Sequence, residues 1–331
     1  MLDGNLLLIV ALLLATAAVF VNGWTDAPNA IATVISTRVL SPTQALAMAA
    51  VLNIAGALVT GTAVATTIGT GIVKPEVVSL QMIAATTLTI IAWSTIAWRY
   101  GIPTSESHEL IAGLTGAGLA VAGPSVLLWE GWRKVLIGLG FSTFLGFFLS
   151  MTVMTGLYWV LRRTSPSLVR NIFGRLQIIS AAFMAFSHGS NDGQKFMGVF
   201  ALALMLGGAT TQFTIPLWVM LLSGSIMGLG TAVGGWRIIR TMGFKVTKLE
   251  PVHGFAAESS AALSILVASF LGIPLSTTHT IGTAIMGVGA TRRFSAVRWG
   301  VAGSIVTTWI VTFPVCAVLG YLFTRLLNLV W

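Results

Sequence analysis

Two aspartates lie inside long apolar stretches of this sequence, where a charged side chain is unfavourable unless a polar partner or a cavity surrounds it. Asp26 lies in "NGWTDAPNAIATVISTR" (residues 22–38), and Asp192 lies in "FSHGSNDGQKF" (residues 186–196). A charge near the middle of a bilayer costs at least ~2.5 kcal/mol, so it must face a cavity or a partner. Hard cations bind in cages of carboxylate, amide and hydroxyl oxygens. We therefore expect Asp26 and Asp192 to hold a metal cation or a proton.

The residues around Asp26 predict an interrupted helix. Pro28 removes a backbone hydrogen-bond donor and, with Gly23, favours a break. The unwound turn would expose carbonyl oxygens, and three neighbours add side-chain oxygens to the cation site: Asn22, Thr25 and Asn29. The alternative is a kink whose polar groups only satisfy one another.

The second aspartate has more polar neighbours, which include His188, Ser190, Asn191, Gln194 and Lys195. Lys195 follows Asp192 by three residues, so the two side chains can pair on one face of a helix. The ammonium could replace a metal cation, contact an anion directly, or only neutralise Asp192. We assign Asn191, Gln194 and Lys195 to anion binding.

Two further segments resemble each other and look like helix starts. "GIPTSESHELIAGLTGAGLA" (residues 101–120) aligns without gaps to "GIPLSTTHTIGTAIMGVGAT" (residues 272–291). Gly and Pro would end the preceding helix, and the new N-terminus presents free N–H groups that bind phosphate-like anions. The expected anion-binding side chains are Ser105, Glu106, Ser107, Ser276, Thr277 and Thr278. The alternative is a pair of capped helix breaks that line a pore without a ligand.

Three other titratable residues lie in apolar segments. His108 and His279 occupy equivalent positions one turn into the two helices, where they could donate to the anion, relay protons or hydrogen-bond within the bundle. Glu258, in "PVHGFAAESSAAL", is an acid without an acidic counterpart in the first half of the chain. We assign all three to coupling with a cation or proton.

The elements that position these residues must be membrane helices. The chain has 331 residues, of which 56% are apolar and 8% charged, whereas soluble domains carry about 25% charged residues. Apolar runs long enough to span a bilayer recur throughout the sequence. The fold class is therefore an all-α polytopic membrane protein with about ten crossings. The expected spans are residues 6–36, 43–68, 77–98, 103–122, 135–160, 176–206, 213–235, 253–271, 273–290 and 299–324.

The aligned segments predict a duplicated chain. Asp26 also aligns with Asp192, so each half would contain an interrupted helix with an aspartate and, later, a Gly-Ile-Pro-x-Ser-x-x-His element. Five crossings per half would give the halves inverted topology, with a site at broken helices or re-entrant hairpins near the midplane, as in secondary transporters. We expect a first repeat at residues 1–160, a basic cytoplasmic loop at 161–175 and a second repeat at 176–331.

The net charge of +9 does not indicate nucleic-acid binding, because most basic residues fall in loops that the helix order places on one side. Basic loops mark the cytoplasmic side, so we expect a multi-pass protein of the cell inner (plasma) membrane. The sequence has no P-loop, no His/Cys metal cluster and no soluble domain that could hydrolyse nucleotide. We expect no enzyme and no cofactor, and a transport process driven by an ion gradient.

The four motifs together resemble the inorganic phosphate transporter (PiT) family, which is related to the eukaryotic sodium–phosphate cotransporters. The resemblance extends over essentially the whole chain. It implies symport of phosphate with a cation at a site around Asp26, Asn29, Asn191 and Asp192. Thr25 and Lys195 depart from the commonest family pattern, which has Asn at both positions. The coupling ion is therefore left open between Na+, bound at Asp26 and Asp192, and H+, with metal–phosphate as a further form of the substrate.

The sequence thus predicts a membrane symporter that imports inorganic phosphate, with arsenate as a mimic. A sulfate permease of the same fold and a passive anion channel are the alternatives. Besides the lipid bilayer and the anion, no nucleic-acid partner is expected, and a homodimer is left open.

Overall fold

In a computed structural model, which describes residues 4–330, the chain folds as a helical bundle. The helices of the first half are α1 Gly4–Thr25, α2 Pro28–Ser36, α3 Pro42–Val59, α4 Ala63–Gly71, α5 Leu80–Tyr100, α6 Glu106–Ala122, α7 Trp129–Gly140 and α8 Gly146–Leu161. Those of the second half are α9 Pro166–Leu206, α10 Leu217–Val233, α11 Trp236–Arg240, α12 Pro251–Phe270, α13 Thr277–Arg292 and α14 Trp299–Val330. Two π-helical turns, Phe141–Leu145 and Thr241–Lys245, extend α7 and α11.

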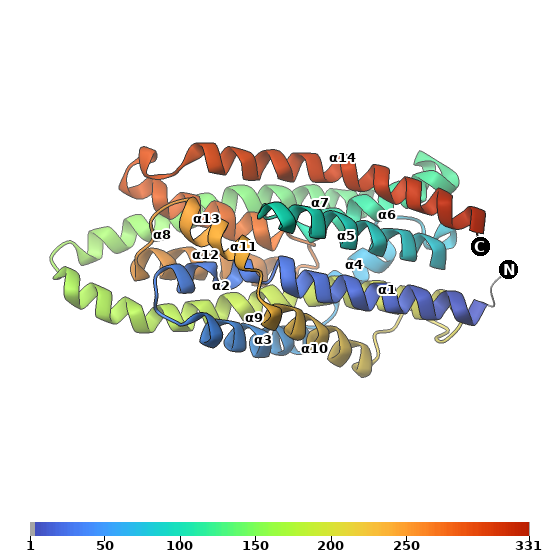
Figure 1. The fold of residues 1–331 in the computed structure, drawn as a ribbon, viewed down its shortest axis with the longest axis horizontal. Helices are drawn as coiled ribbons and strands as arrows, with labels where there is room; N and C mark the ends of the chain where they lie inside the picture. Colours follow the sequence, from blue (N-terminus) through green and yellow to red (C-terminus); the bar gives the residue numbers. More distant parts are fainter. Residues whose placement is uncertain (1–3, 331) are drawn as a thin grey trace.

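The helices run mostly along the long axis of an elongated bundle, with the start of α1 and the end of α14 at one end and the α8–α9 turn at the other (Figure 1). Within residues 4–330, six helical spans have the length and composition of membrane crossings, and the bent pair of α10 with α11 adds a seventh. The prediction of an all-α polytopic membrane protein is therefore confirmed. The ten crossings are not confirmed, because α6 and α13, at 17 and 16 residues, are shorter than the ~20 residues a crossing needs.

The two aspartate segments differ in backbone structure. The first helix is interrupted as predicted, because α1 ends at Thr25 and α2 begins at Pro28, on either side of Asp26. The prediction of a second interrupted helix is wrong, since Asp192 lies inside α9, which is continuous over 41 residues. The physical reason is that the second segment contains glycines but no proline, so every backbone N–H can donate within the helix.

Both Gly-Ile-Pro segments start helices as predicted. Gly101 (φ 68°) and Gly272 (φ 65°) adopt a left-handed conformation that ends the preceding helix, which glycine does without steric penalty. Ser105 is the N-cap residue of α6, and Ser276 caps α13 by accepting from the His279 N–H at 3.1 Å.

The expected cytoplasmic loop at residues 161–175 is mostly helical. Only residues 162–165 separate α8 from α9, whose first residue is Pro166. Proline is favoured at the first position of a helix because its missing N–H would have no partner there. The division of the chain into two repeats stays a prediction.

Close backbone contacts bring α6 against α14 beside the candidate site. A Cβ atom at Gly320 of α14 would lie 2.2 Å from the carbonyl oxygen of Gly113 in α6. The two helices can therefore approach this closely only without a side chain at that point, as in other small-residue membrane contacts.

We expect Gly320→Ala to lower the thermal unfolding temperature of the purified protein, because α6 and α14 must move apart. Overpacking of this kind costs about 1–3 kcal/mol. Gly303→Ala, in the same helix but with open space around the new Cβ, is the control and should unfold like the wild type. Equal unfolding of both variants would contradict the close approach of α6 and α14.

Candidate functional site

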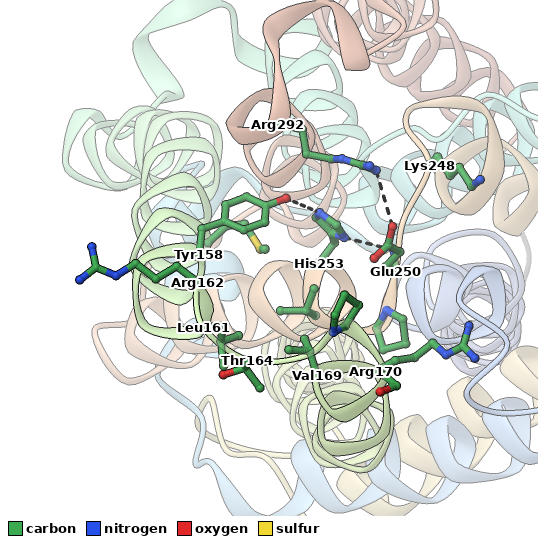
Figure 2. Close-up of a pocket in the computed structure, with 15 residues that line it drawn as sticks. Tyr158, Leu161, Arg162, Thr164, Val169, Arg170, Lys248, Glu250, His253 and Arg292 are labelled. Atoms are coloured by element: carbon green, nitrogen blue, oxygen red, sulfur yellow. Dashed lines mark hydrogen bonds and ion pairs between the residues drawn. The ribbon is translucent and has the colours of Figure 1, made fainter.

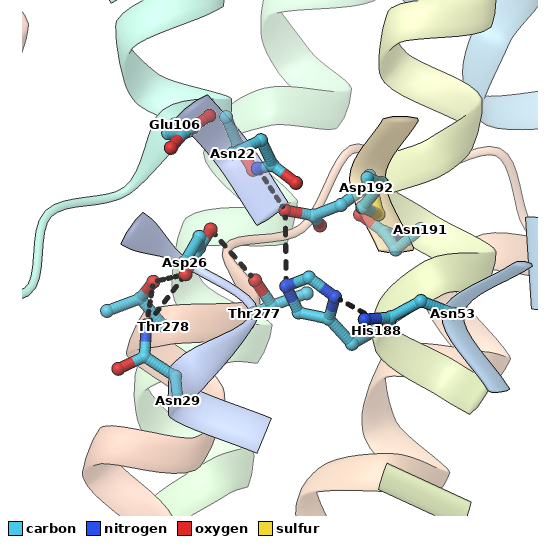
Figure 3. A network of polar contacts seen from close by, with 12 residues as sticks. Asn22, Asp26, Asn29, Asn53, Glu106, His188, Asn191, Asp192, Thr277 and Thr278 are labelled. Carbon is cyan, nitrogen blue, oxygen red and sulfur yellow. Dashed lines mark hydrogen bonds and ion pairs between the residues drawn. The ribbon is translucent and has the colours of Figure 1, made fainter. Parts of the chain in front are cut away.

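The candidate site lies where the α1–α2 break, the middle of α9 and the first turns of α6 and α13 meet (Figure 3). The predicted helix starts face each other, because the Ser107 hydroxyl of α6 donates to the carbonyl of Leu275, just before α13, at 3.0 Å. Most predicted site residues are gathered and buried here: Asn22, Thr25, Asp26, Asn29, Ser105, Glu106, Ser107, Asp192, Lys195, Ser276, Thr277 and Thr278.

Asp26 is held by hydrogen bonds from α2 and α13. Its Oδ1 accepts from the Asn29 amide at 2.7 Å and from the Thr278 hydroxyl. Its Oδ2 accepts from the Thr277 hydroxyl at 3.3 Å. The residue predicted to hold a cation is thus in direct contact with residues predicted to hold an anion.

Asp192 is held by a different set of donors. Its Oδ1 accepts from the Lys195 ammonium at 2.7 Å, and its Oδ2 accepts from the Asn22 amide at 3.2 Å. The Nε2 atom of His188 lies 3.7 Å from Oδ2. Asn22 therefore links the α1–α2 break to the aspartate of α9.

Lys195 uses all three of its ammonium protons. It donates to Asp192 Oδ1, to the Ser107 hydroxyl and, at 2.9 Å, to the Leu275 carbonyl. The lysine pairs with its aspartate as the spacing predicts, and it also joins α9 to the starts of α6 and α13.

His188 was not assigned to the site from the sequence, although it lies four residues before Asp192 on the same helix face. One ligand atom from each of Asp26, His188 and Asp192 lies within 4.8 Å of the others, which is compatible with a shared cation. Asn53 of α3 orients the imidazole through a contact of 3.2 Å to Nδ1.

Two further carboxyl groups lie at the start of α6. Glu106 accepts from the Thr25 hydroxyl, and Glu109 accepts from the Ser94 hydroxyl at 2.5 Å. The second oxygen of each carboxyl is buried and has no hydrogen-bond partner within residues 4–330. Glu109 was missed in the sequence, where its spacing of three from Glu106 was the available signal.

Two predicted anion-binding residues of α9 point to neighbouring helices instead. The Asn191 amide donates to the Ser269 hydroxyl at 3.0 Å. Gln194 accepts from the Val64 N–H at 2.9 Å and lies near Thr60, so it caps the start of α4. Their part in anion binding stays a prediction.

The two histidines pack together behind the helix starts. The His108 and His279 rings are 4.5 Å apart, and His279 stacks on Trp309 of α14 at 3.8 Å. His108 also lies 4.6 Å from Phe313. They therefore face α14 rather than the carboxylates, and their coupling role stays a prediction.

Glu258 belongs to a separate polar cluster. It accepts from Thr33 at 2.5 Å, from Gln177 at 3.0 Å and from the Ser180 hydroxyl. Thr33 lies in α2, seven residues after Asp26. The polar cluster around Glu258 is therefore a neighbour of the candidate site rather than a part of it. The assignment of Glu258 to coupling also stays a prediction.

The comparisons with known proteins agree on one family. The model of the phosphate transporter family matches residues 22–169 and 161–320. The chain belongs to the phosphate transporter family.

A "probable low-affinity inorganic phosphate transporter" of Rhizobium meliloti is 46% identical, over 92% of this chain and 91% of the relative. A protein of the same description from Bacillus subtilis is 39% identical, over 99% of this chain and 100% of the relative. A solved structure described as "The sodium-dependent phosphate transporter" superposes with a TM-score of 0.83 at 27% identity, over 98% and 100% of the two chains.

Family membership and the helical spans identify a multi-pass membrane protein, in agreement with the predicted plasma-membrane location. The relatives are named as transporters or permeases, which are not enzymes, as the sequence predicted.

We expect Lys195→Met to destabilise the protein strongly, because Asp192 would keep a buried charge without its partner. Breaking a buried pair in this way costs about 3–5 kcal/mol. The double variant Lys195→Met/Asp192→Asn should recover much of the loss in a thermal unfolding measurement. Arg133→Met breaks an exposed pair with Glu130 (3.3 Å) and should cost less than about 1 kcal/mol. A single Lys195 variant as stable as the wild type would argue against the buried pair.

Proposed function

We propose that the chain is a secondary symporter that imports inorganic phosphate together with a cation. The observation that carries this proposal is the meeting of two helix starts, α6 and α13, beside the buried carboxylates of Asp26 and Asp192. The family and the names of the relatives support phosphate as the transported anion.

Phosphate would bind between the two helix starts. Free backbone N–H groups and the partial positive charge of each helix end favour an anion without any arginine. The hydroxyl of Ser105 is buried and has no hydrogen-bond partner in the described part of the chain, so it is available to a ligand. The hydroxyls of Ser107 and Thr277 lie at the same two helix starts, but each would have to release its present acceptor, Leu275 or Asp26, to donate to phosphate.

Charge balance gives a reason for coupling. The site contains four buried carboxyl groups and one buried ammonium: Asp26, Glu106, Glu109, Asp192 and Lys195. An anion added to ionised carboxylates would increase an uncompensated charge in surroundings of low dielectric constant. Phosphate binding would therefore require that cations or protons neutralise the carboxyl groups first. The neutral site, with both phosphate and cation bound, could then close to one side of the membrane and open to the other.

Lys195 bears on the number of coupling ions. Its ammonium is surrounded by a carboxylate, a hydroxyl and a carbonyl oxygen, which is a ligand set suited to a small cation. The aligned residue in the first half is Asn29, which carries no charge. We infer that Lys195 acts as a fixed cation at Asp192, so that Asp26 binds the exchangeable one, either Na+ or a proton.

The experiment that tests the proposal is uptake of radiolabelled phosphate into proteoliposomes, with sodium and proton gradients imposed separately. Accumulation against the phosphate gradient with either ion supports symport, and the effective ion is the coupling ion. Purely downhill flux would indicate a passive channel. Competition by arsenate supports a phosphate site, whereas stronger competition by sulfate would indicate a sulfate permease.

We expect Asp26→Asn to abolish cation-driven accumulation of phosphate, because the exchangeable cation loses its charged ligand. In the same variant, the exchange of phosphate across the membrane in the absence of a cation gradient should fall less than the cation-driven accumulation does. Glu130→Gln, an exposed acid at the start of α7, is the control and should transport like the wild type. Unaltered cation-coupled accumulation by the Asp26 variant would refute its role.

We expect Lys195→Asn, which copies the residue of the first half, to need one more cation per transport cycle. The dependence of uptake on the concentration of the coupling ion should steepen, with a Hill coefficient that rises from about one toward two. Lys195→Arg keeps the fixed charge and should keep the wild-type steepness. An active Asn variant with unchanged steepness would contradict the fixed-cation role.

A further inference from the structure

A cavity lined by none of the candidate-site residues lies at the end of the bundle that carries the α8–α9 turn (Figure 2). It has a volume of about 830 Å³ and is formed by the end of α8, the start of α9, the start of α12 and the end of α13. This volume falls within the range of ordinary ligand pockets, about 300–1,000 Å³. The transport site already described does not account for it.

The charges that line this cavity are mostly positive. The basic residues are Arg162, Arg170, Lys248 and Arg292, and the acidic residue among the lining is Glu250. Glu250 lies 3.8 Å from Arg292. The other three cations have no ion-pair partner within the described residues. The Arg162 guanidinium points away from the other lining residues (Figure 2), so the excess positive charge that would attract an anion comes from Arg170 and Lys248.

The inner wall of the cavity is polar and well ordered by hydrogen bonds. The Tyr158 hydroxyl lies 2.8 Å from Nε2 of His253, and the Glu250 N–H donates to Nδ1 of the same ring at 3.3 Å. His253 is 2% exposed, so its ring is fixed at the base of the cavity between α8 and α12. The wall thus supplies a hydroxyl and an imidazole beside the basic rim.

Apolar side chains of α8 and α9 line another part of the cavity: Met154, Leu161 and Val169. Trp159, also on α8, is 67% exposed, and the Arg162 guanidinium lies 5.1 Å from its ring centre. Exposed tryptophan beside arginine is typical of the level of lipid headgroups. A ligand with a charged head and an apolar tail would find both kinds of side chain here.

We propose that this cavity binds the phosphate headgroup of an anionic phospholipid from the leaflet on that side of the membrane. Basic pockets between transmembrane helices are suited to such headgroups, and the positive-inside pattern places this one in the cytoplasmic leaflet. Free inorganic phosphate shares the headgroup chemistry, but it would leave the apolar lining residues without a partner. The lipid is therefore the ligand that uses both the basic and the apolar side chains.

A bound headgroup would join helices that carry the transport site. Arg170 lies at the start of α9, which also bears Asp192, and Arg292 ends α13, which begins beside Asp26. The headgroup would hold these two helix ends together on one side of the membrane. Lipid binding at this cavity would then stabilise the arrangement of the site from a distance.

The test measures binding of phosphatidylglycerol to the purified protein by native mass spectrometry and by its effect on thermal unfolding. Phosphatidylcholine and inorganic phosphate serve as separate probes. The variants are Arg170→Gln and Arg292→Gln, each made singly. Arg133→Gln, which removes an exposed arginine near Glu130 and outside the cavity, is the matched control.

We expect phosphatidylglycerol to bind and stabilise the wild type more than phosphatidylcholine does. Each cavity variant should weaken this binding about fivefold, which corresponds to the ~1 kcal/mol expected for one basic residue near an anionic headgroup. The Arg133 variant should bind like the wild type. Protection by inorganic phosphate is expected from the transport site and should persist in both cavity variants. Equal binding of the two lipids, unchanged lipid binding by both cavity variants, or phosphate protection that both cavity variants lose would overturn the proposal.

Discussion

The arrangement of the site depends on one buried contact, the ammonium of Lys195 between Asp192, Ser107 and the Leu275 carbonyl. A charge this deeply buried is tolerated only with a full set of partners. Those partners belong to α9, to α6 and to the segment before α13. The contact therefore fixes the distance between the two helix starts at which an anion would bind, and it also neutralises one of the two central aspartates.

The halves of the site are similar in residue type but differ in how they are built. Asp26 lies at a helix break and receives its hydrogen bonds from Asn29, Thr277 and Thr278, all uncharged. Asp192 lies in a continuous helix and is paired with a cation. One aspartate is thus already compensated and the other is not. The different parts that we propose for the two carboxylates in ion binding rest on this asymmetry.

Much of this could be predicted from local residue types. Pro28 determined the helix break, and Gly101 with Gly272 determined the two helix starts, because each acts through its own backbone. What sequence alone did not reveal depends on neighbours in space. The alignment of Asp192 with Asp26 predicted a second helix break. The segment around Asp192 has no proline, however, and α9 is therefore continuous. Gln194 turns to α4, and His108 with His279 turn to α14, because packing partners distant in sequence decide where a side chain points.

The unbroken length of α9 has a practical consequence. At ~1.5 Å per residue, its 41 residues extend for about 60 Å, twice the ~30 Å thickness of the hydrocarbon core. Its first turns must therefore project beyond the hydrophobic slab while its middle carries Asp192. Because Leu168 is exposed and lies on the same continuous helix as Asp192, a spectroscopic label at Leu168 would report movement of α9 without altering the side chains around Asp192.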